Sequence, residues 1–257
     1  MRQSSTSVAQ RNEVIVEEMR TLKCFHPFWG YRRVWAHLRY VDGLDVNKKR
    51  ILRLMRQHEL LVQPNQSLKA VRTPGRSKPK PDRPNQWWGI DMTKVMTASG
   101  WAYLVIVLDW YTKQIVGHHC GAIATAREWL TALDRGLNRQ FPNGVREHNL
   151  HLMSDNGSQP TSLPFIRACG VLKVHQAFTS YNNPKGNADT ERMMRTLKEE
   201  LIWLREWPSV NEVTAELNKW IESYNENYLH SALGYRTPNR AEKAYNMSRR
   251  TLLETAC

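Results

Sequence analysis

Several features that would place this chain in a specialised class are missing. Its four cysteines are few and widely spaced, with no Cys-x-x-Cys pair, which argues against a zinc knuckle or a disulfide scaffold and suits a reducing compartment. No apolar run reaches the roughly 18 residues of a membrane span, and the first residues lack the apolar core of a signal peptide. We therefore expect a cytoplasmic protein without a membrane partner. Its 257 residues allow one sizeable domain and a smaller one.

Acidic residues are scarce in the first third of the chain. Residues 1–84 hold 18 lysines and arginines against 7 aspartates and glutamates, whereas residues 85–257 hold 19 against 17. Such asymmetry suits a polyanionic partner, and nucleic acid is favoured over membrane because no basic amphipathic anchor stands out. The alternative is a basic surface that serves solubility alone.

Three short helices are predicted within residues 1–63, at 8–23, 26–40 and 45–61. Basic residues fill most of the last helix outside its apolar face, which is typical of a helix-turn-helix module whose last helix contacts DNA. A small helical bundle that packs on its neighbour is the alternative. The apolar side of the first helix is predicted to hold Val14, Ile15, Met19 and Leu22. The expected DNA contacts are Lys48, Lys49, Arg50 and Arg53, together with Arg32 and Arg33.

The segment 64–84 is rich in proline and basic residues and has almost no apolar periodicity, so we expect an extended linker that can lie along phosphates. From residue 85 to 245 strands alternate with helices, which predicts a mixed-sheet α/β domain, followed by a tail at 246–257. The predicted strands are 87–95, two within 101–120, 149–154 and 171–176, and the predicted helices are 125–141, 164–169, 188–207 and 210–228.

Three acids in this domain stand in unusual positions. Asp91 lies inside the apolar segment WWGIDMTKV, where an ionised side chain is costly unless it is paired or bound to a metal. Asp155 ends a second predicted strand in SDNGSQ, where a plain turn residue is the alternative. Glu191 lies in the first turns of a predicted helix, where an ordinary solvated acid is the alternative and Glu199 and Glu200 are nearby candidates. Carboxylate oxygens are the ligands that Mg²⁺ takes, and a pair of such ions can activate a nucleophile and stabilise a leaving oxygen in phosphodiester chemistry.

With these residues the chain resembles the Asp-Asp-Glu retroviral-integrase superfamily, and more closely the OrfB-type transposases of two-frame bacterial insertion sequences. The resemblance also covers HPFWGYRRVWAHLR, YNNPKGNADTERMMRTLKEEL and YNENYLHSALGYRTPNRAE, in order along nearly the whole chain. It departs from the family at Pro160, where Phe or Tyr is common, and at DWYTKQIVG, where a Ser-Arg pair is frequent.

The resemblance implies an RNase H-like fold with a five-stranded mixed sheet, preceded by a small all-α helix-turn-helix domain. It implies a transposase that cleaves element ends and joins a 3′-hydroxyl to another phosphodiester. Asp91, Asp155 and Glu191 would be the catalytic metal ligands for two Mg²⁺ ions, with Mn²⁺ as a substitute. Arg195 and Lys198 share the helix face of Glu191 and would contact DNA phosphate, as would Lys185 from a nearby loop.

Family resemblance also implies partners: DNA ends and target, further copies of the chain assembled on DNA, and the upstream-frame protein or a fusion with it. The expected setting is the bacterial nucleoid. Two alternatives to a transposase are a nuclease of the same fold and a non-catalytic DNA-binding regulator derived from a transposase.

Other candidate residues have structural explanations. Asp109 ends an apolar strand and is predicted to be a turn acid, with metal contact as the alternative. The run His118-His119-Cys120 cannot converge on one ion, because neighbours on a strand point to opposite faces. Trp87 and Trp88 are predicted to pack in the core and at its rim, with base stacking as the alternative.

Overall fold

The chain forms two compact units, residues 1–72 and 73–257, in a computed structural model that describes residues 6–62, 79–179 and 186–254. Within these ranges no helix combines the length and the apolar character that crossing a bilayer requires.

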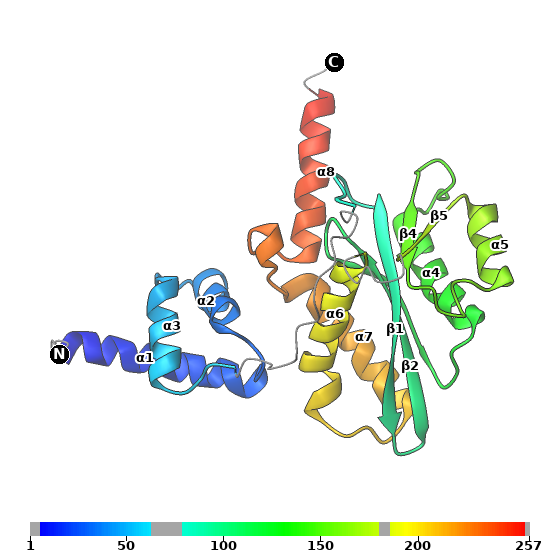
Figure 1. Ribbon diagram of the computed structural model, residues 1–257. Coiled ribbons are helices and arrows are strands. Elements are labelled where there is room, and N and C mark those ends of the chain that lie inside the picture. Colours follow the sequence, from blue (N-terminus) through cyan, green and yellow to red (C-terminus); the bar gives the residue numbers. More distant parts are fainter. Residues whose placement is uncertain (1–5, 63–78, 180–185, 255–257) are drawn as a thin grey trace, which may run out of the picture. The chain divides into compact units, whose positions relative to one another are not determined.

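The N-terminal unit consists of helices α1 (Thr6–Phe25), α2 (Tyr31–Tyr40) and α3 (Lys48–Gln57) (Figure 1). Their apolar faces share one core that includes Ile15, Met19 and Leu54. The Asn47 side chain caps α3 by accepting a hydrogen bond from the backbone N–H of Lys49 at 2.8 Å. The three predicted helices are therefore present.

One predicted core residue of α1 is wrong. Val14 is 63% exposed, and Val16 is buried in its place. The reason is helical spacing, since Val16 lies three residues before the fully buried Met19 and so shares its face.

The C-terminal unit is built on a five-stranded mixed sheet in the order β3-β2-β1-β4-β5. Strands β1 (Trp87–Thr97), β2 (Gly100–Asp109) and β3 (Ile115–Gly121) pair antiparallel, whereas β4 (His151–Ser154) and β5 (His175–Phe178) continue the sheet in parallel from β1. Helices α4 (Ala126–Gln140), α5 (Leu163–Leu172), α6 (Ala188–Glu200), α7 (Val210–Asn227) and α8 (Pro238–Glu254) complete the unit, with short 3-10 turns at Ile202–Leu204 and Ser231–Leu233. This is the predicted RNase H-like arrangement.

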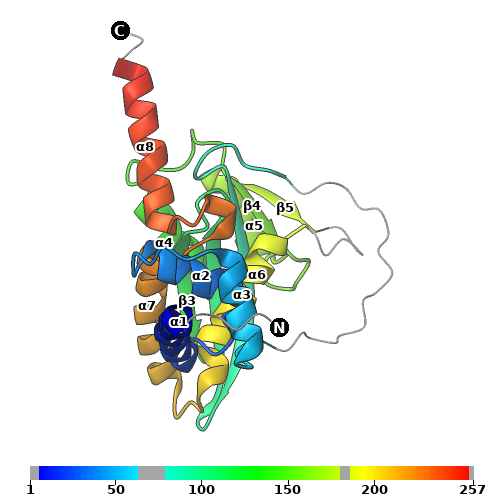
Figure 2. The same ribbon diagram turned by 90° about the vertical axis from the view of Figure 1, so that its left-hand side faces the viewer.

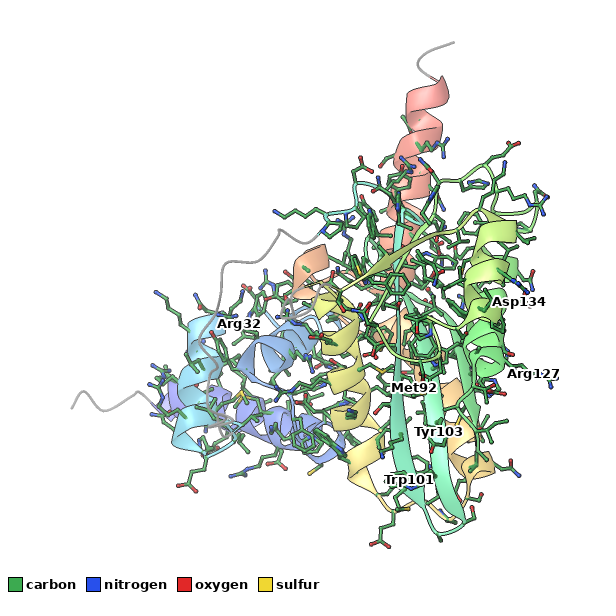
Figure 3. All side chains as sticks on the ribbon, turned by 45° about the vertical axis from the view of Figure 1, so that its right-hand side comes forward. Arg32, Met92, Trp101, Tyr103, Arg127 and Asp134 are labelled. Atoms are coloured by element: carbon green, nitrogen blue, oxygen red, sulfur yellow. The ribbon has the colours of Figure 1, made fainter. Side chains whose placement is uncertain are left out.

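Helices cover both faces of the sheet. Alternate residues of β2 divide between two cores: Ile106 packs with side chains of α6 and α7, and Val107 packs with those of α4 and α5. On α4, Arg127 and Asp134 point away from the sheet, while Met92, Trp101 and Tyr103 mark the β1–β2 hairpin (Figure 3). The sheet is thus the middle layer of three.

Three predicted boundaries in this unit are wrong. The strand expected at 171–176 begins only at His175, because α5 continues to Leu172. The helix expected at 188–207 ends at Glu200, and Leu204, which follows in a 3-10 turn, is 44% exposed. The segment expected to be a tail belongs largely to α8, which runs to Glu254 and extends beyond the sheet in both views (Figures 1 and 2).

Candidate active site

The pairing of β1 with β4 places Asp91 beside Asp155. In this parallel pair Trp87 is opposite His151 and Gly89 is opposite Met153. Strand β4 ends at Ser154, so Asp155 is the first residue after the strand and lies two residues beyond Met153, the last paired position. The charge of Asp155 raises the pKa of Asp91, so the two carboxylates lie close to one another beside the paired strands.

The turn after β4 is well bonded. The backbone N–H of Gly157 donates to Oδ1 of Asp155 at 3.1 Å, and the Asn156 side chain donates to the carbonyl of Thr179 at 2.7 Å. Pro160 is buried, and its carbonyl accepts a hydrogen bond from Gln176 of β5 at 3.1 Å. Asp155 is therefore a turn residue as well as an exposed acid at the end of a strand.

Helix α6 approaches the sheet because Gly89 has no side chain. A Cβ at this position would lie 1.9 Å from Oγ1 of Thr190, 2.5 Å from Nε1 of Trp110 and 2.8 Å from Oδ1 of Asn187. Because glycine leaves this space open, the buried Trp110 indole can donate a hydrogen bond to Oγ1 of Thr190 at 3.0 Å. This contact holds the first turn of α6, and Glu191 follows Thr190 directly.

A second contact holds the same turn. The Lys113 ammonium donates to the Asp189 carboxylate at 2.8 Å and to the carbonyl of Trp110 at 2.6 Å. Neither this contact nor the role of Gly89 is predicted above from the sequence. The one sign present in the sequence is a lone glycine inside a strand pattern, since such a glycine marks a bulge or the close approach of another segment.

The carboxylates interact electrostatically. Burial raises the pKa of Asp91 to about 6; a hydrogen bond from the backbone of Met92 opposes this, while the charges of Asp155 and Glu191 raise the pKa further and Lys198 lowers it. Burial also raises the pKa of Glu191. Three acids and one lysine, drawn from two strands and one helix, therefore share one electrostatic environment.

The donor set suits a hard divalent cation. A carboxylate such as Asp91, whose pKa is raised by burial and by neighbouring negative charge, is stabilised in its ionised form when a cation neutralises it. In the described part of the chain, no three His, Cys, Asp or Glu side chains converge closely enough to hold a metal ion. The residues thus fit the chemistry of Mg²⁺, and they would have to draw closer together to coordinate it.

The predicted DNA contacts on α6 have different surroundings. Lys198 is half-buried and acts on Asp91, so it lies beside the carboxylates. Arg195 is exposed and forms an ion pair with Glu199 at 2.7 Å. Lys185 lies outside the described residues.

The basic residues of the N-terminal unit also differ. Arg50 donates twice to Oδ1 of Asn12, at 3.0 and 2.8 Å, and so joins α3 to α1. Lys48 lies 4.1 Å from the centre of the Trp35 ring, while Lys49 and Arg53 are exposed one turn apart on α3. On α2, Arg32 is exposed over the ring of Tyr31, and Arg33 is half-buried.

The remaining candidates have structural roles. Asp109 is buried and accepts hydrogen bonds from the backbone of Tyr111 and from both the backbone and the hydroxyl of Thr112. On β3, His118 contacts Asn218 of α7 at 2.7 Å. His119 alternates with His118 along the strand and so points to the opposite face.

The two tryptophans of β1 differ in burial. Trp88 is fully buried, whereas the half-buried Trp87 stacks on Trp110 and His151.

Comparisons with known proteins match both units. Two models described as integrase core domain match residues 81–184 and 172–238, and an HTH-like domain matches residues 10–67. A solved simian T-cell lymphotropic virus intasome has the same fold, with a TM-score of 0.53 and 16% identity over 87% of this chain and 74% of that one. Fold and matches together define an integrase-core protein with a helix-turn-helix-like module.

The curated relatives that the chain resembles are transposases of insertion sequence elements. The transposase of insertion sequence element IS629 from Shigella sonnei is 29% identical over 93% of this chain and 82% of its own length. Transposase InsD of insertion element IS2D from Escherichia coli (strain K12) is 28% identical over 82% and 72%. The chain therefore carries an integrase core domain and an HTH-like domain, and the curated relatives it resembles are transposases of insertion sequences.

Proposed function

We propose that the chain is a DNA transposase that cleaves the ends of an insertion sequence and transfers the freed 3′-hydroxyl to another phosphodiester. The observation that supports this proposal is the proximity of Asp91 on β1 to Asp155, which directly follows the paired strand β4 and whose charge raises the pKa of Asp91. The effect of Glu191 on the pKa of Asp91 supports the third position of the set.

In this proposal Asp91, Asp155 and Glu191 hold two Mg²⁺ ions, for which Mn²⁺ would substitute. When bound, the ions supply Lewis-acid activation of the attacking oxygen and neutralise the charge on the leaving oxygen. Lys198 holds the phosphate of the cleaved strand through its ammonium group, since it already acts on Asp91. Arg195 contributes from the exposed side of α6 once it exchanges Glu199 for phosphate.

We assign DNA recognition to α3 of the N-terminal unit. Lys49 and Arg53 are exposed basic residues on one face of this helix, as is Arg56, whereas Arg50 joins α3 to α1. Lys48, Arg32 and Arg33 add positive charge nearby, and Lys185 adds charge from the catalytic unit. Two element ends must be processed together, so we propose that several copies assemble on DNA at the bacterial nucleoid, with the upstream-frame protein as partner or fusion.

The test is Asp155→Asn, with Asp134→Asn as a matched control on the outward face of α4. The asparagine carbonyl can still accept the hydrogen bond from Gly157, so the turn is retained while the charge is lost. We expect cleavage and joining to fall about 10³-fold or more, since metal-assisted charge stabilisation contributes several kcal/mol. The control should retain both activities.

Intact strand transfer by Asp155→Asn would refute the catalytic assignment. A duplex with a pre-cleaved end separates the two alternative functions. Hydrolysis without joined product would indicate a nuclease, and DNA binding without any metal-dependent cleavage would indicate a regulator.

A further inference from the structure

A pocket of about 680 Å³ lies in the C-terminal unit, beside the candidate active site. Its walls come from the turn after β2, the first turn of α6, the segment between α7 and α8, and one side of α8, with Pro79, Lys80 and Pro81 at its edge. The volume is within the range of about 300–1,000 Å³ that is typical of small-molecule pockets.

Two tyrosines form an aromatic wall. Tyr111 and Tyr245 meet edge to face, with ring centroids 5.6 Å apart and planes at 72°. Both line the pocket and both are half-buried, and Trp110 lies beside them in the lining. Half-exposed tyrosine rings offer the flat apolar surface on which nucleobases stack regardless of sequence.

The pocket also carries an excess of positive charge. Its lining includes Lys80, Lys113 and Arg236 but only one acid, Asp189. The ion pair between Lys113 and Asp189 balances two of these charges, so Lys80 and Arg236 set the net sign. An arginine and a lysine at the edge of an aromatic pocket suit a phosphate that accompanies an aromatic base.

The pocket and the carboxylates use two sides of the same helical turn. Asp189 lines the pocket, and Glu191, two residues later, points elsewhere because successive residues turn by about 100° along a helix. Trp110 lines the pocket and also donates to Thr190 between these two acids. The pocket and the proposed cleavage site are therefore joined by the first turn of α6, which contributes Asp189 to the one and Glu191 to the other.

We propose that this pocket binds one nucleotide of the DNA substrate that has left the duplex, with its base against Tyr111 and Tyr245 and its phosphate at Lys80 and Arg236. The proposal rests on the proposed function, since it concerns the DNA that is cleaved. Unpairing and unstacking one base costs a few kcal/mol, and stacking of that base on the tyrosines offsets the cost.

The experiment uses the full chain and duplexes that carry one 2-aminopurine, placed in turn at each position around an element end. Its neighbours already quench 2-aminopurine in the duplex, so quenching by the pocket is measured as the rise in fluorescence at the same position when Tyr245→Ala, at saturating protein, replaces the wild type. We expect quenching at one position only, and we expect Tyr245→Ala to weaken binding of that duplex about 5- to 150-fold, the range for loss of one stacked base. Tyr245→Phe should keep the stack, and Met247→Ala, an exposed change on α8 outside the pocket, should have no effect.

A second pair of variants tests the phosphate. Arg236→Gln should weaken binding and lower the salt dependence, whereas Arg240→Gln, an exposed arginine outside the lining, should not alter the quenching. Equal behaviour of Tyr245→Ala and Met247→Ala would overturn the proposal. Absence of quenching at every duplex position would also overturn the proposal. If 2-aminopurine deoxynucleoside monophosphate nevertheless bound at Tyr245, the pocket would be assigned to a free nucleotide.

Cleavage by the wild-type protein, measured in the same samples, tests the proposed function separately. Normal Mg²⁺-dependent cleavage without quenching refutes the pocket alone. Absent cleavage refutes the transposase assignment and with it the source of the nucleotide.

Discussion

The substitution Gly89→Ala tests how α6 is held on the sheet. The added Cβ would lie 1.9 Å from Oγ1 of Thr190 and 2.5 Å from Nε1 of Trp110. Both distances are far below van der Waals contact, and the two atoms belong to buried side chains. The first turn of α6 must therefore move away from β1, and Glu191 moves with it.

The magnitude follows from two costs. Overpacking of a filled core costs about 1–3 kcal/mol. Loss of the buried hydrogen bond from Trp110 to Thr190 adds about 1–3 kcal/mol if both groups stay buried. We expect the free energy of unfolding of the C-terminal unit to fall by about 2–5 kcal/mol, and strand cleavage to fall even where the protein remains folded.

Urea unfolding and cleavage assays measure the two effects, with Gly170→Ala as control. Gly170 lies in α5 with no atom within 4 Å of an added Cβ, so this variant should gain about 0.5–1 kcal/mol. In a Thr190→Ala background the penalty of Gly89→Ala should shrink, because the nearest clashing atom is gone. A stability of Gly89→Ala within about 0.5 kcal/mol of wild type, the usual effect of a neutral surface change, would refute the close approach of α6.

Three further predictions concern other parts of the chain. Burial raises the pKa of Asp109 from 3.8 to about 6. The folded protein therefore holds the Asp109 proton more tightly than the unfolded chain, and about 3 kcal/mol of stability that is present below pH 4 is lost as the pH rises through 6. Asp109→Asn should abolish that part of the pH dependence in urea titrations between pH 4 and 7. Lys49→Gln and Arg53→Gln should each lower the salt slope of DNA affinity by about 1, whereas Arg50→Gln should lower the melting temperature of the N-terminal unit because it breaks the contact with Asn12. Asp189→Asn should cost about 1–2 kcal/mol in urea unfolding by weakening the hold of Lys113 on α6, and an unchanged midpoint would show that this ion pair contributes nothing.

Local patterns predicted most of the fold. Alternating apolar residues and turn residues located β1, β2 and β3, and the apolar spacing of α4 and α7 located those helices, because these periods follow directly from backbone geometry. The ends of helices and strands that depend on tertiary contacts were harder to predict from the sequence. The end of α6 at Glu200 is one example: no helix breaker stands at that point of the sequence, and the turn at Ile202–Leu204 that follows packs Ile202 into the core.

The sequence draws attention to the acids of the candidate site but not to the residues that hold them in position. Asp91 and Asp155 stand out because each interrupts or ends an apolar strand. The parts that position α6 are spread over the chain: Gly89 on β1, Trp110 and Lys113 after β2, and Asp189 and Thr190 on α6. Such contacts join residues about 80 positions apart, and no local pattern encodes them.

The hydrogen bond between Trp110 and Thr190 also provides a hydrogen-exchange probe of how α6 moves. The indole proton is buried and occupied, so it exchanges with solvent deuterium only when the first turn of α6 lifts from the sheet. Its exchange rate, followed by NMR as the indole signal of Trp110, measures how often Glu191 leaves the neighbourhood of Asp91. A slowing of that rate on addition of DNA or Mg²⁺ would report, in seconds or hours, how firmly each one closes the helix onto the sheet.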